Sequence, residues 1–407
     1  MKKLIILFAI LSTFQAGAQD SLKVEPVSFE LGSGLNFQFN EGKYAFKISG
    51  MVQPNIGFDT YEDEETEYFL NTRRTYFNIG GNAVDEKVSF FLQLDFSRNN
   101  PLLDAWMAWE PVSDLKFTFG QKQTIANNRE MMIMETFLQF PDRGLLSTSF
   151  SRTGREMGLF VEYGISLGDF KIKPQIAVTS GDGINSFGAD SRDVDLGGLK
   201  YAARLDVYPL GTFKNGNGNL IPDLMHEESL KLVVGGAASF NDGASDAVGE
   251  GHGNFTLFDG EGAPQQPDYR QVYGDILMKY KGFSFLGEYV VATATNLAGT
   301  YTATTVTEED ILVPTEISQY LSLGSSYNAQ IGYATKSGFA LDFRYAAVTP
   351  EFDENPGSVL TEISGYTVGV SKYFKGNALK VQAALSSTDY SDDTNRLAGT
   401  LLVQLIF

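Results

Sequence analysis

The sequence contains no cysteine and only two histidines, His226 and His252, among its 407 residues. The absence of cysteine excludes disulfides, cysteine–zinc sites, thiol nucleophiles and a lipid-anchoring cysteine. Two histidines are too few for a histidine-rich metal site. The sequence therefore predicts neither a metal site nor a cofactor.

Basic residues are also scarce, with 31 Lys and Arg against 50 Asp and Glu. A nucleic-acid partner is not expected, because phosphate contacts need clustered basic side chains. Disorder is equally unexpected, since 43% of the residues are hydrophobic and 13% aromatic. The 42 glycines together with the many aromatic residues are typical of a chain built from strands and turns.

Motifs for enzymatic catalysis are missing. No nucleophile-elbow motif accompanies His226 or His252, and both histidines fall in predicted connections. No Gly-Lys-Ser/Thr phosphate-binding loop occurs either. We therefore do not expect an enzyme, although an outer-membrane hydrolase is the alternative that these two histidines would allow.

No run of eighteen apolar residues occurs anywhere in the chain, so no transmembrane helix is predicted. The N-terminus has basic Lys2 and Lys3, an apolar stretch at 4–11 and the small residues Ala16-Gly17-Ala18. This pattern predicts a secretory signal peptide over residues 1–18. An uncleaved membrane anchor is the alternative.

Beyond residue 44, apolar and polar residues alternate, as in Val88, Phe90, Leu92 and Leu94. A period of two indicates strands with one apolar and one polar face. Sixteen such strands are predicted near 45–60, 68–80, 87–97, 102–110, 115–124, 155–164, 169–180, 197–208, 229–241, 270–280, 283–295, 320–334, 339–349, 363–374, 378–388 and 396–407.

The connections between these strands alternate between short and long, except at 98–101 and 209–228. Short turns at one end and long loops at the other are typical of an outer-membrane β-barrel with both termini in the periplasm. The chain is then expected to comprise the signal peptide, a periplasmic segment at 19–44 with one short strand, and an all-β barrel domain at 45–407. A soluble sandwich or propeller is the rival architecture.

Aromatic residues flank several short turns, for example Trp109 with Phe117 and Tyr333 with Phe339. Such rings suit the interface between lipid and water, so outer-membrane lipid is an expected partner. The final strand is amphipathic and ends at Phe407. We expect the barrel-assembly machinery to recognise this terminal residue.

The polar faces of the strands would line a water-filled lumen. The basic residues predicted to line the pore are Lys47, Arg74, Lys116, Lys171, Lys173, Lys200, Arg204 and Arg344. Acidic side chains on the same faces nearly balance them, and the long loops are strongly acidic.

The connection at 125–153 differs from the other long loops because it balances arginines against acids and contains many apolar residues. If it folds into the barrel, Arg129 and Arg143 would lie at the pore constriction, with Arg152 and Lys122 nearby. The alternative is a surface loop whose ion pairs have no part in conduction.

Several runs resemble the phosphate-selective porin O and P family, particularly its members from Bacteroidetes-type bacteria. The matching runs are Gly120-Gln121-Lys122, Asn128-Arg129-Glu130, Leu138-Gln139-Phe140, Asp142-Arg143, Arg155-Glu156-Met157-Gly158, Tyr208-Pro209-Leu210-Gly211, Phe240-Asn241-Asp242-Gly243-Ala244 and Phe283-Ser284-Phe285-Leu286-Gly287-Glu288-Tyr289. The resemblance implies a sixteen-stranded trimeric porin whose third loop constricts the pore.

One feature departs from that family. Its phosphate-selective members resemble one another in a basic ladder and a lysine cluster along the pore, whereas no contiguous lysine cluster occurs in this sequence. Phosphate is therefore not established as the solute. The expected function is passive diffusion of small hydrophilic solutes with some anion preference, and the alternative is a structural or adhesive surface barrel without an open channel.

The two constriction arginines generate a first prediction. Replacing Arg129 and Arg143 together by Gln should shift the reversal potential towards cations, because each guanidinium keeps its charge and offers forked donors to oxyanions. Unchanged ion selectivity in a correctly assembled barrel would assign both arginines a structural role.

Overall fold

The computed structural model describes residues 25–62, 64–84, 86–184, 197–214, 216–251, 253–352, 355, 357–392 and 394–407. The expected signal peptide at 1–18, the segment 185–196 and His252 lie outside the described residues. Within these described ranges, no helix is long and apolar enough to cross a membrane.

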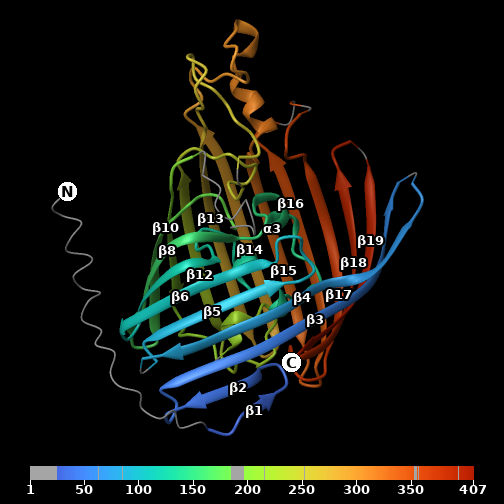
Figure 1. The fold of residues 1–407 in the computed structure, drawn as a ribbon. Coiled ribbons are helices and arrows are strands. Elements are labelled where there is room, and N and C mark those ends of the chain that lie inside the picture. The colour runs from blue at the N-terminus through green and yellow to red at the C-terminus, as the bar shows by residue number, and fades with distance from the viewer. Residues whose placement is uncertain are drawn as a thin grey trace, which may run out of the picture.

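The fold is a closed antiparallel β-barrel of sixteen strands, as the sequence predicts (Figure 1). Its strands are β3 (Tyr44–Tyr61), β4 (Glu67–Ala83), β5 (Val88–Asp95), β6 (Leu102–Val112), β7 (Leu115–Gln123), β8 (Arg155–Tyr163), β10 (Phe170–Thr179), β11 (Lys200–Tyr208), β12 (Lys231–Asn241), β13 (Asp268–Tyr280), β14 (Phe283–Thr295), β15 (Gly324–Ala334), β16 (Phe339–Pro350), β17 (Ile363–Tyr373), β18 (Leu379–Tyr390) and β19 (Asn395–Ile406). Three shorter strands are β1 (Ser28–Glu30), β2 (Gly34–Phe39) and β9 (Ile165–Leu167).

Short helical elements occur only in the connections of the described chain. They are α2 (Arg129–Met132), α3 (Leu145–Phe150) and the 3₁₀ turns η2 (Glu135–Phe137), η4 (Asn217–Asn219), η5 (Glu308–Asp310) and η6 (Pro314–Gln319). Two of the predicted features differ in detail. The strand expected from residue 320 begins at Gly324, because Leu321 and Leu323 are buried among the outer loops instead. The single short strand expected before the barrel is a hairpin, β1–β2, whose second strand pairs with the start of β3.

The barrel closes where the last strand, β19, pairs with the first, β3. The final rung lies between Gly50 and Phe407, whose backbone N–H groups each donate to the other's carbonyl, at 2.6 and 2.9 Å. A Cβ at Gly50 would stand 2.8 Å from the Phe407 ring. Only glycine leaves room for the terminal ring, so this contact fixes the register in which the barrel closes.

The outer surface of the barrel is apolar. Val272, Ile331, Leu341 and Val370 alternate with inward polar residues, and each leaves about half of its surface exposed, between 51% and 61%. A closed barrel satisfies its backbone hydrogen bonds internally, and an apolar exterior suits lipid. These properties place the chain in the bacterial outer membrane.

Aromatic rings gather at the short-turn end of this apolar surface, as predicted. Trp109 stacks on Phe117 with ring centroids 5.8 Å apart, and Phe283 lies 4.5 Å from Tyr333. By the general orientation of such barrels, the short-turn end faces the periplasm and the long-loop end faces the exterior.

The wall is uneven in height. β5, β6 and β7 are short, and β5 pairs with β4 only from Tyr76 to Ala83. The upper part of β4 therefore has no strand beside it on that side within the described residues, and its Tyr68 and Leu70 are 81% and 80% exposed. The β3–β4 hairpin projects beyond the neighbouring wall (Figure 1).

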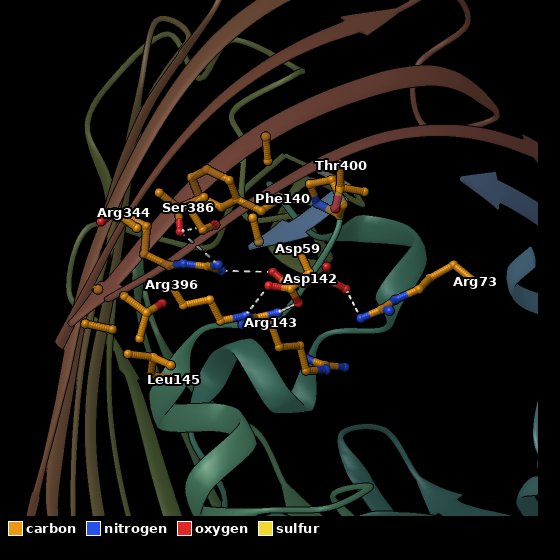
Figure 2. A pocket seen from close by; sticks show the side chains of 18 of the residues that line it. Asp59, Arg73, Phe140, Asp142, Arg143, Leu145, Arg344, Ser386, Arg396 and Thr400 are labelled. Carbon is orange, nitrogen blue, oxygen red and sulfur yellow. Dashed lines mark hydrogen bonds and ion pairs between the residues drawn. The ribbon is translucent and has the colours of Figure 1, made fainter. Parts of the chain in front are cut away.

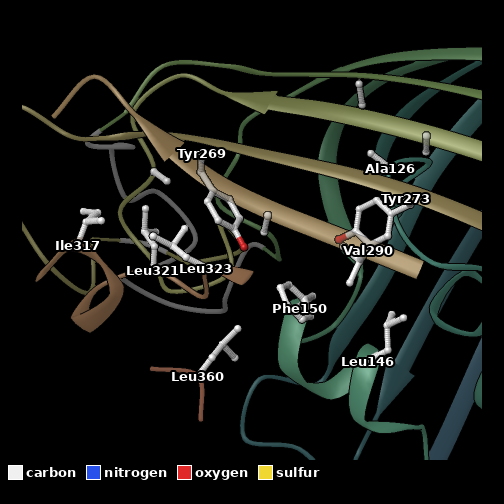
Figure 3. Close-up of a cluster of buried hydrophobic side chains, with 14 of the residues drawn as sticks. Ala126, Leu146, Phe150, Tyr269, Tyr273, Val290, Ile317, Leu321, Leu323 and Leu360 are labelled. Atoms are coloured by element: carbon white, nitrogen blue, oxygen red, sulfur yellow. The ribbon is translucent and has the colours of Figure 1, made fainter. Parts of the chain in front are cut away.

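The largest apolar cluster lies at the long-loop end and joins the outer loops to the barrel interior. Leu321 and Leu323 of one loop and Leu360 of another pack in the same cluster as Tyr269 and Phe150 of α3 (Figure 3). The outer loops thus form a packed cover over one half of the barrel mouth.

A second prediction concerns the closing rung. Gly50→Val should reduce the folded, heat-modifiable form in outer-membrane extracts, because the added side chain displaces the Phe407 ring. Gly274→Val is the matched control, since Gly274 lies in strand β13 with no atom near its missing side chain. Equal assembly of the two variants would show that the terminal ring does not set the register.

Candidate functional site

The connection between β7 and β8, called here the third loop (residues 124–154), folds into the barrel and carries α2, η2 and α3 (Figure 1). Arg129 anchors its start to the wall through ion pairs with Asp206 at 2.7 Å and Asp275 at 2.5 Å. Arg204 bridges the same two carboxylates. All four side chains are buried. A Cβ at Gly235 would come within 2.6 Å of both guanidinium groups, so glycine is needed beneath this network.

The carboxylate of Glu130 ties the middle of the third loop together. It accepts hydrogen bonds from the Gly144 N–H at 2.8 Å and the Ser147 hydroxyl at 2.6 Å. From the barrel wall, Gln330 donates to it at 2.6 Å and Arg344 forms an ion pair at 3.5 Å. One acidic side chain therefore links both halves of the loop to strands β15 and β16.

An outer loop holds the end of the third loop. The Glu250 carboxylate accepts hydrogen bonds from the backbone N–H groups of Arg152, Thr153 and Gly154, at 2.8 to 3.1 Å. The Arg152 side chain forms an ion pair with Asp246 of the same outer loop at 2.9 Å. Successive backbone N–H groups around one carboxylate form an anion-binding nest. The Glu250 carboxylate therefore holds the end of the third loop through backbone groups, with no basic side chain of the described chain as its partner.

The long connection at 209–230 approaches the third loop from the short-turn end. Ile221 packs with Ile133 and Leu138, and its N–H donates to the Phe137 carbonyl at 3.4 Å. The buried Lys279 ammonium of β13 donates to backbone carbonyls of this connection, including that of Leu220 at 2.7 Å. The exceptional length of this connection on the short-turn side is thus used to fill the lumen beneath the third loop.

Two cavities remain open on the outer side of the third loop, with volumes of about 240 and 350 Å³. They share Arg73, Asp142 and Arg143, and together we call them the arginine chamber (Figure 2). The charged residues that line it are Arg73, Arg74, Arg98, Arg143, Arg152, Arg155, Arg344 and Arg396 against Asp59, Asp95, Glu135 and Asp142. Eight arginines face four carboxylates there, and no lysine lines either cavity.

Most of these arginines are paired with acids. Arg73 pairs with Asp142, and Arg396 binds Asp59 with an Nε–Oδ1 distance of 2.7 Å (Figure 2). In the described part of the chain, Arg74 and Arg98 form no ion pair. Arg74 instead donates to the Gln53 side chain at 2.9 Å and to a backbone carbonyl. Three further arginines pair with carboxylates behind the lining: Arg152 with Asp246, Arg155 with Asp104 and Arg344 with Glu130. Eight arginines therefore stand against seven carboxylates, which leaves a small excess of positive charge.

Arg143 lies at the boundary of the chamber. It forms an ion pair with Glu135 at 2.8 Å and donates to the Ile133 carbonyl at 2.9 Å. Burial alone would raise the pKa of Glu135, but Arg143, Arg155 and Arg74 overcome this and lower it. Glu135 thus stays ionised, and the Arg143 charge is partly neutralised.

The predicted constriction residues take different positions. Arg143 and Arg152 line the arginine chamber, whereas Arg129 is buried in the wall network. Lys122 forms an ion pair with Glu162 at 3.0 Å. Their role in conduction remains a prediction, and the double replacement of Arg129 and Arg143 would also leave wall carboxylates unpaired.

The predicted lining residues separate into five groups. Arg74 and Arg344 line the arginine chamber, Arg204 belongs to the wall network, and Lys200 is buried against Glu156. Lys47 lines a cavity at the short-turn end. Lys116, Lys171 and Lys173 line another cavity there, together with Lys214.

This last group adds to the sequence observation that no contiguous lysine cluster occurs. The lysines are distant in sequence, yet the register of β7, β8 and β10 brings them to one cavity. Carboxylates offset their charge: Lys116 pairs with Glu110, Lys171 with Asp114 and Lys173 with Glu162.

Sequence reasoning missed Arg73, Arg98, Arg155 and Arg396. The alternation of the last strand places Arg396 on the inward face, so this signal was available. Arg73 could not be found in this way because it is the extra residue of a β-bulge opposite Gln53 and Pro54. The bulge allows Arg73 and Arg74, although adjacent, both to reach the third loop.

Comparison with solved structures identifies the fold of outer-membrane channels. The outer membrane channel DcaP of Acinetobacter baumannii has a TM-score of 0.55 and 10% identity, covering 90% of this chain and 99% of its own. OprB of Pseudomonas putida has a TM-score of 0.49 and 13% identity, covering 89% and 94%. No protein-family model matches the chain, and no curated protein matches it.

A third prediction tests the wall network. Asp206→Asn combined with Asp275→Asn leaves Arg129 and Arg204 buried without counter-charges, which should weaken loop anchoring by about 3–5 kcal/mol. We expect noisier and larger single-channel currents. Asp392→Asn with Asp310→Asn removes two loop acids that face solvent and should leave currents unchanged. Identical recordings from both double variants would mean that the loop is held by its other contacts alone.

Proposed function

We propose that the protein is an outer-membrane porin for passive diffusion of small hydrophilic solutes, with a preference for anions set in the arginine chamber. The observation that carries this proposal is the set of eight arginines that line the open space beside the third loop, of which Arg74 and Arg98 form no ion pair in the described chain. No catalytic step, metal or cofactor forms part of it.

The electrostatic argument depends on where the charges are. The long outer loops are acidic, but they lie in high-dielectric water, where salt screens charges beyond roughly 10 Å at 0.1 M. The arginine chamber is bounded by the barrel wall and the third loop, so its field is less screened. A permeating ion is therefore selected in the chamber rather than by the loops.

Arginine also determines the kind of anion. Its planar guanidinium presents paired N–H donors that match carboxylate and phosphate oxygens. We propose oxyanions as the solute class, with phosphate as one member. The resemblance to the phosphate-selective porin O and P family supports oxyanions as solutes, because basic residues line the arginine chamber and a cavity near the short-turn end. The lysines of that cavity are, however, paired with carboxylates.

A barrel without an open channel is the second candidate, and one observation favours it. The third loop, the connection at 209–230 and the packed outer loops fill much of the barrel around β11–β16. A structural or adhesive barrel of this kind would conduct no ions in a planar bilayer.

A homotrimer is part of the proposal. The upper edge of β4 has backbone groups without a neighbouring strand in the described chain, and unpaired backbone groups in lipid cost free energy. Tyr68 and Leu70 on this part of β4 are also exposed. A second copy of the chain packed against this low part of the wall would cover them. A monomeric mass in mild detergent would count against it.

A fourth prediction tests anion selectivity. Arg74→Gln with Arg98→Gln removes two arginines that have no ion pair in the described chain, so no carboxylate partner is left unpaired. The anion-to-cation permeability ratio should fall about fivefold, the equivalent of ~1 kcal/mol.

Lys372→Gln provides the control, because its ammonium lies over Phe339 at the short-turn rim, outside the lumen. It removes a positive charge without touching the arginine chamber. A reversal potential that moves equally in the control and the double variant would refute selection in the chamber.

A further inference from the structure

A cavity of about 540 Å³ lies at the short-turn end, on the other side of the third loop from the arginine chamber. Strands β2 to β6 form its wall, and Met134, Thr136 and Phe137 of the third loop form its roof. Lys47 is its only charged lining residue, and no carboxylate lines it. We call it the aromatic chamber, and its chemistry differs from that of every other cavity described above.

Two aromatic rings make a platform on its wall. Phe91 and Trp106 are direct partners across β5 and β6, with ring centroids 5.8 Å apart and planes inclined by 39°. Gly80 lies beside Phe91 on β4, and a Cβ there would stand 3.1 Å from the Phe91 ring. The glycine leaves room for the Phe91 ring, and both rings are partly exposed. The Lys116 ammonium lies over Trp106, 5.4 Å from the ring centroid, so a ligand would share this ring with a cation.

Several polar groups around the platform are uncommitted. The Thr136 hydroxyl has no hydrogen-bond partner, but the oxygen is itself buried and not open to the cavity. Among the described residues, the side chains of Gln38, Ser89 and Lys47 and the indole N–H of Trp106 also form no hydrogen bond. Thus hydroxyl, amide and indole groups surround a ring surface without a negative charge.

We propose that the aromatic chamber binds the ring of a small carbohydrate. A pyranose presents an apolar C–H face that suits an aromatic platform, and its hydroxyl edge can both donate to and accept from the uncommitted groups. An aromatic hydrocarbon would leave these polar groups unpaired, and a small inorganic anion would not use the rings.

The inference deepens the proposed function and rests on it for the path of the solute. A solute that used both chambers in turn would be a sugar carrying a carboxylate or phosphate group. The anionic group would pair with arginines on the outer side of the third loop, and the ring would then rest on Phe91 and Trp106.

The first test measures block of single-channel current by maltose added at the short-turn side. Maltose is uncharged, so the arginine chamber alone gives no reason for block. Block should be reversible and concentration-dependent. Trp106→Ala or Phe91→Ala should weaken it about tenfold, because an aromatic contact contributes roughly 0.5–1.5 kcal/mol. Trp109→Ala is the control, since Trp109 lies on the outer face of the same strand.

A second readout does not require conduction. The chain contains two tryptophans, so Trp109→Phe leaves Trp106 as the only one. Maltose should then change the emission of this variant in detergent, and Phe91→Ala in the same background should weaken the response about tenfold. This measurement separates the two proposals, because a chain that conducts nothing can still bind sugar.

Absence of both maltose block and any emission change would overturn the carbohydrate proposal. The proposal would also be overturned if benzoate blocked the current in a Trp106-dependent way and maltose did not. That result would assign the platform to aromatic acids. If glucuronate blocks the current and Trp106→Ala leaves this block unchanged, the arginine chamber is the only binding site. This result would overturn the present inference, while the proposed function would stand.

Discussion

The arrangement of the lumen depends on the ion-pair network that Arg129 of the third loop forms with the wall of the barrel. Two arginines and two aspartates are buried together there, with nitrogen–oxygen distances of 2.5 to 2.9 Å. Removing such charges from water is costly, and their mutual attraction roughly offsets that cost without adding much net stability. Their main effect is positional, because a displaced loop would leave Arg129 without a counter-charge and the two aspartates with Arg204 alone.

That single attachment makes the barrel asymmetric. The third loop is drawn towards β11 and β13, where the connection at 209–230 meets it from below and the outer loops cover it from above. The arginine and aromatic chambers therefore remain on the opposite side, along β3 to β6 and β16 to β19. A barrel of sixteen strands is wide enough to keep a chamber on each side of the third loop, which also meets the opposite wall where Lys380 donates to the Thr136 and Leu138 carbonyls.

The amino-acid sequence predicts the strands well because a wall between lipid and water imposes a strict alternation of side chains. It also predicts the inward loop, whose apolar residues need a buried environment. It does not predict pairings that depend on register: Arg129 meets Asp206 and Asp275 only through the ladder from β11 to β13, and the bulge at Gln53 moves Arg73 off the regular period. Strand positions follow from local pattern, whereas the site follows from long-range register.

The same distinction explains which charges can select a solute. A guanidinium held within 3 Å of two carboxylates acts on a distant ion mainly as a neutral group, because the opposing fields nearly cancel. Arg129, the most prominent arginine of the loop sequence, is in this position. Arg74 and Arg98 are not, because neither is held in an ion pair within the described chain. Anchoring and selection thus require opposite environments, and the selection we propose falls to arginines other than the one that anchors the loop.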